Sequence, residues 1–164
     1  MTFSMRRMAI IAALAVATLL GWTAPSFAAT NYDWPLEGVP AVVRAFDPPP
    51  KPWLAGHRGV DLAAAPGATV IAAGDGTVAF AGQVAGKPVV SIDHADGIRT
   101  TYEPVVATVA AGQPVTRGQQ IGILQPDHPE CSASACLHWG AKRGENYLDP
   151  LGLLRPRRVR LLPR

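Results

Sequence analysis

Residues 68–82 read ATVIAAGDGTVAFAG, and this stretch indicates the fold more clearly than any other part of the chain. Two short apolar runs, 68–73 and 77–82, have the length and the β-branched content that are typical of strands. Gly74-Asp75-Gly76 separates them, and a glycine-rich step of this kind is typical of a tight turn. The stretch therefore predicts a strand, a turn and a return strand.

The rest of the chain repeats this pattern at intervals of roughly ten residues, with no helical period between the apolar runs. His94-Ala95-Asp96-Gly97 contains the Asp-Gly signal of a hairpin. The chain has 16 glycines and 16 prolines, which suits a fold with many turns. We expect an all-β fold, a compact antiparallel β-sandwich or barrel-like single domain with turn-rich loops. Its further strands cover 89–93, 98–102, 120–124 and 137–141, with a short turn at 150–154.

The first 28 residues have the pattern of a secretory signal peptide. Arg6 and Arg7 form a basic start, an apolar run follows from Met8 to Leu20, and Ser26-Phe27-Ala28 resembles an A-x-A cleavage site. The apolar run is shorter than the roughly 20 residues of a membrane-spanning helix. We expect residues 1–28 to be a signal peptide, 29–33 a linker, 34–154 the β domain and 155–164 a basic C-terminal tail.

Charge is distributed unevenly along the chain. The formal net charge is +3, but Arg6 and Arg7 lie in the signal segment and five arginines lie in the tail. Residues 29–154 have 8 basic and 12 acidic side chains, a charge of −4. This balance argues against nucleic-acid binding. The basic tail is either a solvated end or a contact for anionic wall polymer or lipid headgroups.

Two clusters contain residue types that bind metals. His57 and Asp61 are four residues apart, and in an extended segment an even separation places both side chains on one face. In Cys136-Leu137-His138-Trp139-Gly140, alternation places Cys136 and His138 on one face. Imidazole and carboxylate are zinc ligands, and three protein ligands with an open position are typical of catalytic zinc. Taken singly, the first cluster is more typical of a surface His–Asp pair, and the lone histidine of the second is more often structural.

The two clusters belong to a longer series of motifs that resembles the lysostaphin/LytM-type zinc peptidases, which cut peptide cross-links in bacterial cell walls. The resemblance covers Trp34 to about Leu154. It implies a compact antiparallel β fold and one Zn²⁺ ion bound by His57, Asp61 and His138. Its motifs include HRGVDL at 57–62, GDGTV at 74–78, CLHWG at 136–140 and LDPL at 148–151.

The family usually has two further histidines beside the metal, as general base and as stabiliser of the oxyanion, and this sequence lacks both. Pro104 stands in the tyrosine-x-histidine motif, and Cys136 stands two residues before the last ligand. We weigh two substitutes. Glu103 is a carboxylate that, in a regular strand, faces away from the position of the missing histidine, and His128 lies in a loop that can reach back. The catalytic residue therefore stays open.

The chain has two cysteines, Cys131 and Cys136. They are near each other, and an exported protein meets an oxidising compartment, so we expect a disulfide between them. The alternative is a Cys136 thiolate as fourth zinc ligand, which would close the site into a structural one. Tyr102 and Trp139 are candidates to line a substrate groove, with core packing as the alternative for Trp139.

These observations lead to an exported zinc metalloendopeptidase-like domain, secreted or in the cell envelope, that acts on peptidoglycan cross-link peptides through zinc-activated water. The alternative is a catalytically impaired zinc-binding module that binds cell-wall peptide or regulates a partner wall hydrolase. In either case we expect a monomer without a membrane span after signal cleavage. Fold alone does not establish turnover, so the choice between the two rests on the chemistry of the site.

Overall fold

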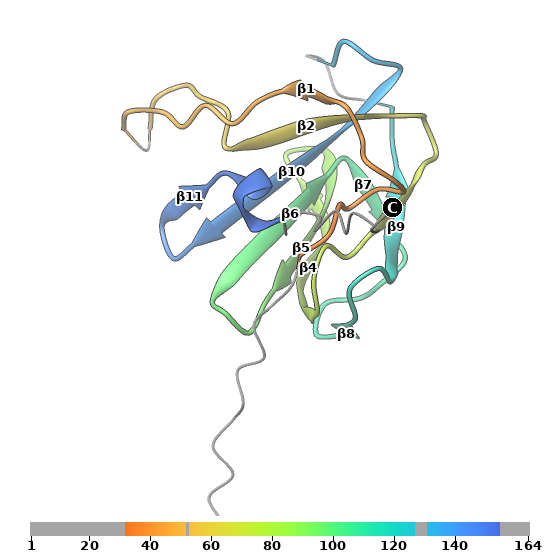
Figure 1. Cartoon of the computed structure of the whole chain (residues 1–164). Coiled ribbons are helices and arrows are strands. Elements are labelled where there is room, and N and C mark those ends of the chain that lie inside the picture. The colour runs from red at the N-terminus through yellow and green to blue at the C-terminus, as the bar shows by residue number, and fades with distance from the viewer. Residues whose placement is uncertain (1–31, 52, 127–130, 155–164) are drawn as a thin grey trace, which may run out of the picture.

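The computed structural model describes residues 32–51, 53–126 and 131–154, which form two antiparallel sheets (Figure 1). The larger sheet contains, in spatial order, β1 (Val42–Arg44), β2 (Gly59–Ala64), β10 (Ala135–Arg143), β6 (Ile98–Glu103), β5 (Lys87–Asp93), β4 (Gly76–Val84) and β8 (Pro114–Val115), with β11 (Asn146–Leu148) paired to β10. The smaller sheet contains β3 (Thr69–Ile71), β9 (Gln120–Leu124) and β7 (Val105–Ala107). A short 3₁₀ helix, η1 (Pro150–Leu153), follows β11.

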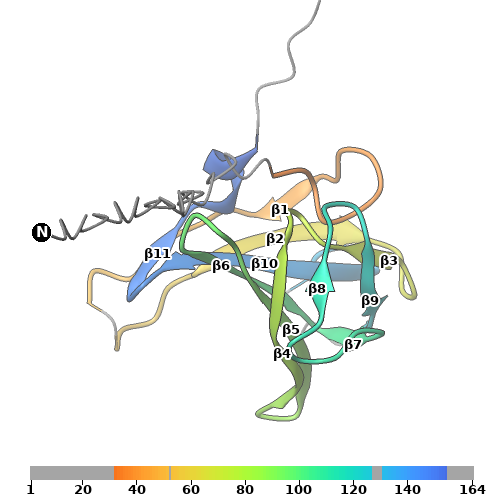
Figure 2. The ribbon, with the colours of Figure 1, turned by 90° about the horizontal axis from the view of Figure 1, so that it is seen from below.

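The hydrophobic core includes residues of both sheets, and the smaller sheet lies beside the larger one near β4 and β8 (Figure 2). Alternation along β10 buries Leu137 and Trp139 and turns His138 to the other face of the sheet. Val70 and Ile121 of the smaller sheet belong to the same core cluster. One face of the larger sheet is therefore core, and the other is left for a site.

The predicted all-β architecture is confirmed, and so are the strands at 89–93, 98–102, 120–124 and 137–141. The prediction that 68–73 and 77–82 are directly paired is wrong. β3 pairs with β9, whereas β4 pairs with β5 and β8. The chain passes from the smaller to the larger sheet between β3 and β4. In this segment Ala72 bonds through its backbone to Gln119 and Gly118 instead of to β4.

Tyr102 and Trp139 do not line a groove, so both groove-lining predictions are wrong. Each is 0% exposed, and the two residues are direct cross-strand neighbours on the core face. The Tyr102 hydroxyl accepts a hydrogen bond from the Ala73 backbone N–H, and burial raises the pKa of Tyr102 to about 12. Core packing, the alternative for Trp139, is what the structure shows.

Several predictions fall outside the described residues: the signal peptide 1–28, most of the linker, the loop residue His128 and the tail 155–164. Two linker residues are described and belong to the fold. Tyr32 is 3% exposed and bridges to Leu154, and the Asp33 N–H donates to the Ala73 carbonyl. In the described ranges, no helix has the length and apolarity needed to cross a membrane.

Candidate metal centre

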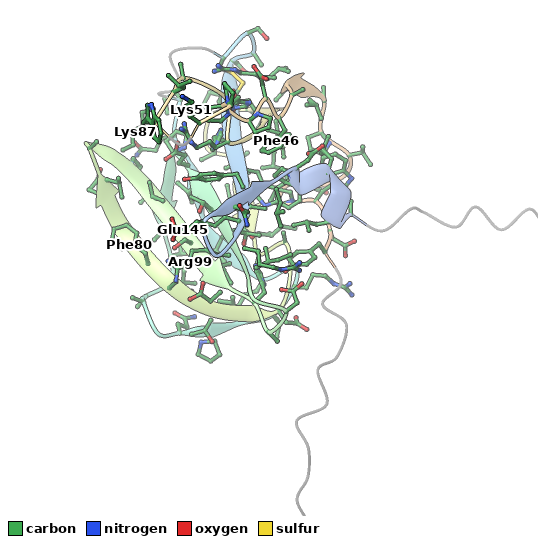
Figure 3. All side chains as sticks on the ribbon, turned by 90° about the vertical axis from the view of Figure 1, so that its left-hand side faces the viewer. Phe46, Lys51, Phe80, Lys87, Arg99 and Glu145 are labelled. Carbon is green, nitrogen blue, oxygen red and sulfur yellow. A yellow bond between two sulfur atoms is a disulfide. The ribbon has the colours of Figure 1, made fainter. Side chains whose placement is uncertain are left out.

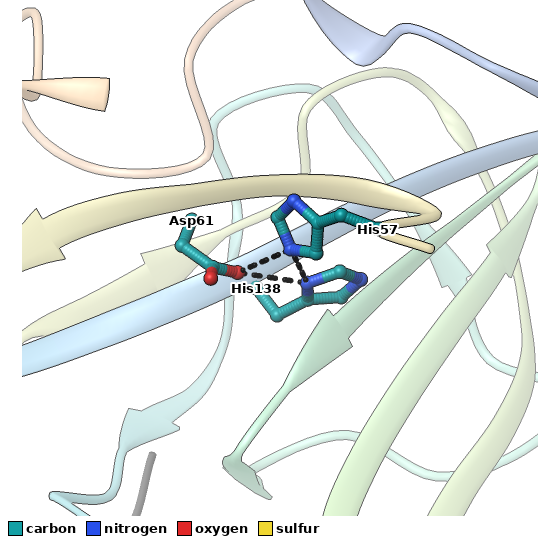
Figure 4. Close-up of side chains that lie close together, drawn as sticks. All are labelled: His57, Asp61 and His138. Carbon is teal, nitrogen blue, oxygen red and sulfur yellow. Dashed lines mark hydrogen bonds and ion pairs between the residues drawn. The ribbon is translucent and has the colours of Figure 1, made fainter. Parts of the chain in front are cut away.

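The three predicted ligands lie on two neighbouring strands, β2 and β10, and on the segment just before β2 (Figure 4). Asp61 on β2 and His138 on β10 are direct cross-strand partners, and paired residues of an antiparallel ladder present their side chains on the same face. His57 precedes β2 and is held by a bridge to Asp47, with hydrogen bonds in both directions between the two backbones. Residues 81 positions apart in sequence are thereby brought together.

The three ligand atoms converge closely. The His57 Nε2 atom lies 3.0 Å from Asp61 Oδ1 and 3.0 Å from His138 Nδ1, and His138 Nδ1 lies 2.8 Å from Asp61 Oδ1. In a tetrahedron of zinc bonds, ligand atoms stand about 3.3 Å apart. The observed spacing therefore needs only a small expansion for the three residues to hold one ion together.

The hydrogen bond behind His57 fixes which of its nitrogens faces the site. His57 Nδ1 lies 2.7 Å from the Ala45 carbonyl oxygen. A carbonyl only accepts, so Nδ1 carries a proton, and in the neutral imidazole the nitrogen that faces Asp61 and His138, Nε2, has the lone pair. Metal-binding histidines usually have such an outer partner. Asp61 is 0% exposed and His57 6%, so a cation would compensate a buried carboxylate among acceptor atoms.

The absence of a side chain at Gly59 leaves the space that the His138 ring occupies. A Cβ atom at Gly59 would lie 2.7 Å from His138 Nε2 and 2.5 Å from the Trp139 carbonyl oxygen. Only a residue without a side chain lets β2 and β10 approach while the imidazole lies against them. At the neighbouring Gly140 the nearest heavy atom would be 3.5 Å away, which is ordinary contact.

A groove of about 520 Å³ opens over the ligands. A row of cross-strand partners runs beneath it, Arg44 on β1, Asp61 on β2, His138 on β10 and Glu103 on β6, each paired to the next. The residues that line it are Arg44, Gly56, His57, Arg58, Lys87, Thr101, Glu103, His138, Gly140, Ala141, Lys142 and Tyr147.

Glu103 lies on the groove side of its strand. It is the direct cross-strand partner of His138 and lines the groove, while Pro104, at the position of the missing histidine, is buried. Glu103 is the last residue of β6, and Pro104 lies between β6 and β7. The carboxylate is therefore placed next to a ligand.

The sulfur of Cys136 is not available to a metal ion. Cys131 and Cys136 form a disulfide, and Cys136 is 0% exposed. The expected disulfide is thus present, and the alternative of a fourth, thiolate ligand has no support in the structure. The two positions where the family usually has further histidines, Pro104 and Cys136, therefore have no titratable side chain here.

His94, the remaining described histidine, lies outside the groove. Its Nδ1 donates to the Asp75 carbonyl, 2.8 Å away, and its Nε2 lies 2.7 Å from the Thr100 hydroxyl. Burial lowers the pKa of His94, partly offset by the hydrogen bond to Asp75. It directly follows strand β5, and its backbone bonds to Gly97 and Ile98 across the turn.

The sequence analysis missed the basic residues of the groove, Arg44, Arg58, Lys87 and Lys142. One of them was accessible to simple reasoning: Lys142 is four residues after His138 on the same strand, so both share a face. The others come from separate elements, and no sequence motif connects them.

Comparisons with known proteins agree with the site. A model described as "Peptidase family M23" matches residues 55–150. The uncharacterized protein Rv2891 of Mycobacterium tuberculosis is 55% identical over 151 residues, which cover 89% of this chain and 60% of that protein. The DD-carboxypeptidase/endopeptidase Mpg of Neisseria gonorrhoeae is 32% identical over 101 residues, or 61% of this chain and 23% of Mpg.

Solved structures show the same fold. Csd3 of Helicobacter pylori is 28% identical with a TM-score of 0.62, covering 81% of this chain and 37% of Csd3. Lysostaphin of Staphylococcus simulans has a TM-score of 0.59 at 24% identity, covering 70% of this chain and 50% of lysostaphin, which supports the fold alone. The chain spans 60% of the length of its mycobacterial relative. Because the family match covers more than half of the residues and includes His57, Asp61 and His138, the chain belongs to peptidase family M23.

Proposed function

We propose that this domain is an exported, zinc-dependent endopeptidase that hydrolyses cross-link peptides of peptidoglycan. The observation that carries the proposal is the convergence of one carboxylate and two imidazoles, with the His57 lone pair directed inward by the Ala45 carbonyl. The set is three protein ligands, the number found in catalytic rather than structural zinc sites. It also lies at the floor of an open groove that can admit a peptide.

Each residue of the site has a distinct task in this proposal. Zinc, when bound, supplies a Lewis acid and lowers the pKa of its water towards about 7. Asp61 contributes the negative charge of the ligand set, and the strand pair β2–β10 keeps it beside His138. Glu103 is placed to accept a proton from the attacking water and to pass it to the leaving amine, a contribution of about 10² to 10⁴ in rate.

A second candidate function has one specific observation in its favour. Pro104 and the disulfide-bonded Cys136 occupy the two positions where the family usually has catalytic histidines. A domain that keeps the metal and the groove but lacks both histidines can serve as a binding module for wall peptide, or as a regulator of a partner wall hydrolase. Turnover then separates the two functions, because both retain zinc.

The test is peptide release from purified cell walls by zinc-loaded protein, with and without a chelator. We expect new amino groups to appear with zinc and to be absent after chelation. Glu103→Gln should lower the rate at least 100-fold while zinc stoichiometry stays at one. Glu145→Gln is the matched control, since Glu145 is an exposed carboxylate in the turn between β10 and β11. Zinc binding without chelator-sensitive release in any wall preparation would favour the binding module.

A further inference from the structure

The groove concentrates positive charge in a domain that is otherwise acidic. The described residues include eight Lys and Arg side chains and ten Asp and Glu side chains. Four of the eight cations line the groove, namely Arg44, Arg58, Lys87 and Lys142. Of the ten carboxylates only Glu103 lines it, and Asp61 is buried beneath it among the metal-binding residues. Such segregation within a small domain creates a local positive potential, and field lines are focused in a concave site.

The four cations come from different elements and line the same groove as the ligands His57 and His138. Arg44 ends β1 and is paired with Asp61. Lys87 begins β5 at the end of the β4–β5 hairpin (Figure 3). Lys142 shares the groove face of β10 with His138, four residues away, which corresponds to about 13 Å along the strand. A ligand that extends from the metal centre along β10 therefore meets a cation after about four residues of extended chain.

Arg58 is held in place before any ligand binds. Its guanidinium lies 5.5 Å from the centre of the Tyr147 ring and donates a 3.1 Å hydrogen bond to the Leu54 carbonyl oxygen. A guanidinium stacked on an aromatic ring loses less conformational freedom when it binds a ligand. Its planar set of N–H donors matches the two oxygens of a carboxylate.

We infer that the groove selects peptides with free carboxylates and discriminates against the same peptides in amidated form. Lys142 binds a carboxylate about four residues from the hydrolysed bond, and Arg58 binds a second one beside Tyr147, the cross-strand partner of Lys142. This inference deepens the proposed function and rests on it for the identity of the peptide. The carboxylate preference itself belongs to the cations and does not need turnover.

The experiment measures equilibrium binding of two labelled synthetic stem peptides by fluorescence anisotropy. Both contain isoglutamate and diaminopimelate, one with free and one with amidated side carboxylates. We expect the free form to bind the zinc-loaded protein at least tenfold more tightly, a difference that shrinks as salt screens the charges. The metal-free protein should keep most of this preference, because the four cations remain.

Variants assign the preference to the groove. Lys142→Gln should reduce the difference between the two peptides about fivefold, with an unchanged melting temperature and unchanged zinc stoichiometry. Arg117→Gln is the matched control, because Arg117 pairs with Asp33 outside the groove. Equal binding of the two peptides, or an unchanged preference in Lys142→Gln, would overturn the inference.

Three further outcomes are decisive. If a polyphosphate chain competes better than the free-carboxylate peptide, the groove is a polyanion site and the inference is wrong. If the preference is present but no peptide bond is cut, the inference stands and the proposed hydrolysis fails. Hydrolysis of both peptides at the same rate and affinity would leave the function in place and refute the carboxylate preference.

Discussion

Replacing Gly59 with alanine tests how β2 and β10 position the last ligand. The new Cβ would lie 2.7 Å from Nε2 and 2.8 Å from Cε1 of His138, and 2.5 Å from the Trp139 carbonyl oxygen. Ordinary contact begins at 3.4 Å, so the ring must retreat by about 0.7 Å, or the strands must separate by a similar distance. Zinc–ligand distances tolerate about 0.2 Å, so the imidazole can no longer keep its position.

We expect Gly59→Ala to weaken zinc affinity by about 10- to 100-fold, the range found when the support of a ligand is removed. The metal-free protein should also lose about 1–3 kcal/mol of stability through overpacking. Competition with a chromogenic zinc chelator gives the affinity, and denaturant unfolding gives the stability. Because the two effects are measured separately, a general loss of folding cannot be mistaken for a local effect on the ligand.

Gly140→Ala is the matched control, because Gly140 is paired with Gly59 on the same face. Its Cβ would meet nothing closer than 3.5 Å, so zinc affinity should stay within about twofold of the original protein. Equal zinc affinity in both alanine variants would refute the reasoning, since it would show that the His138 ring does not depend on the space at Gly59.

Three other predictions concern the metal, the disulfide and pH. Zinc at 1,000 times its Kd should stabilise the fold by about 4 kcal/mol, and His138→Ala should abolish the shift in melting temperature that zinc produces. Replacing Cys131 and Cys136 together with serine should cost about 2 kcal/mol in denaturant unfolding, since the closed loop is short; an unchanged unfolding midpoint would contradict this. His94 stays neutral in the fold because burial lowers its pKa, whereas the unfolded chain takes up a proton near pH 6.5. The stability that neutral His94 contributes is therefore present above about pH 6.5 and lost as the pH falls. When the pH is lowered from 8 to 5.5, the metal-free His94→Gln variant should lose less free energy of unfolding than the metal-free original protein.

The strands and the ligand faces were accessible from sequence because both depend on local alternation. Leu137 and Trp139 against Cys136 and His138 already separate the core face from the site face. The pairing of β3 was not accessible, since β3 lies beside β9, with Val70 opposite Gly122, rather than beside the next strand along the chain. Spacing predicts that strands exist, but long-range register decides which of them meet.

The groove shows the same limit. Tyr102 resembles a groove residue because its motif usually includes a catalytic histidine, yet its ring fills the core beside Trp139. Glu103 directly follows the predicted strand at 98–102, but only the register with β10 shows that it lies beside His138. The basic residues of the groove come from β1, the segment before β2, β5 and β10, so their convergence depends on the assembled fold.

X-ray absorption at the zinc edge tests the metal centre most directly. The zinc-loaded protein should contain one ion per chain, with two nitrogen ligands at about 2.0–2.1 Å from His57 and His138 and an oxygen from Asp61 at about 2.0–2.2 Å. An exchangeable water should complete the shell, as a catalytic site requires. A sulfur scatterer at about 2.3 Å, or less than a tenth of an ion per chain after loading, would contradict the three-ligand centre.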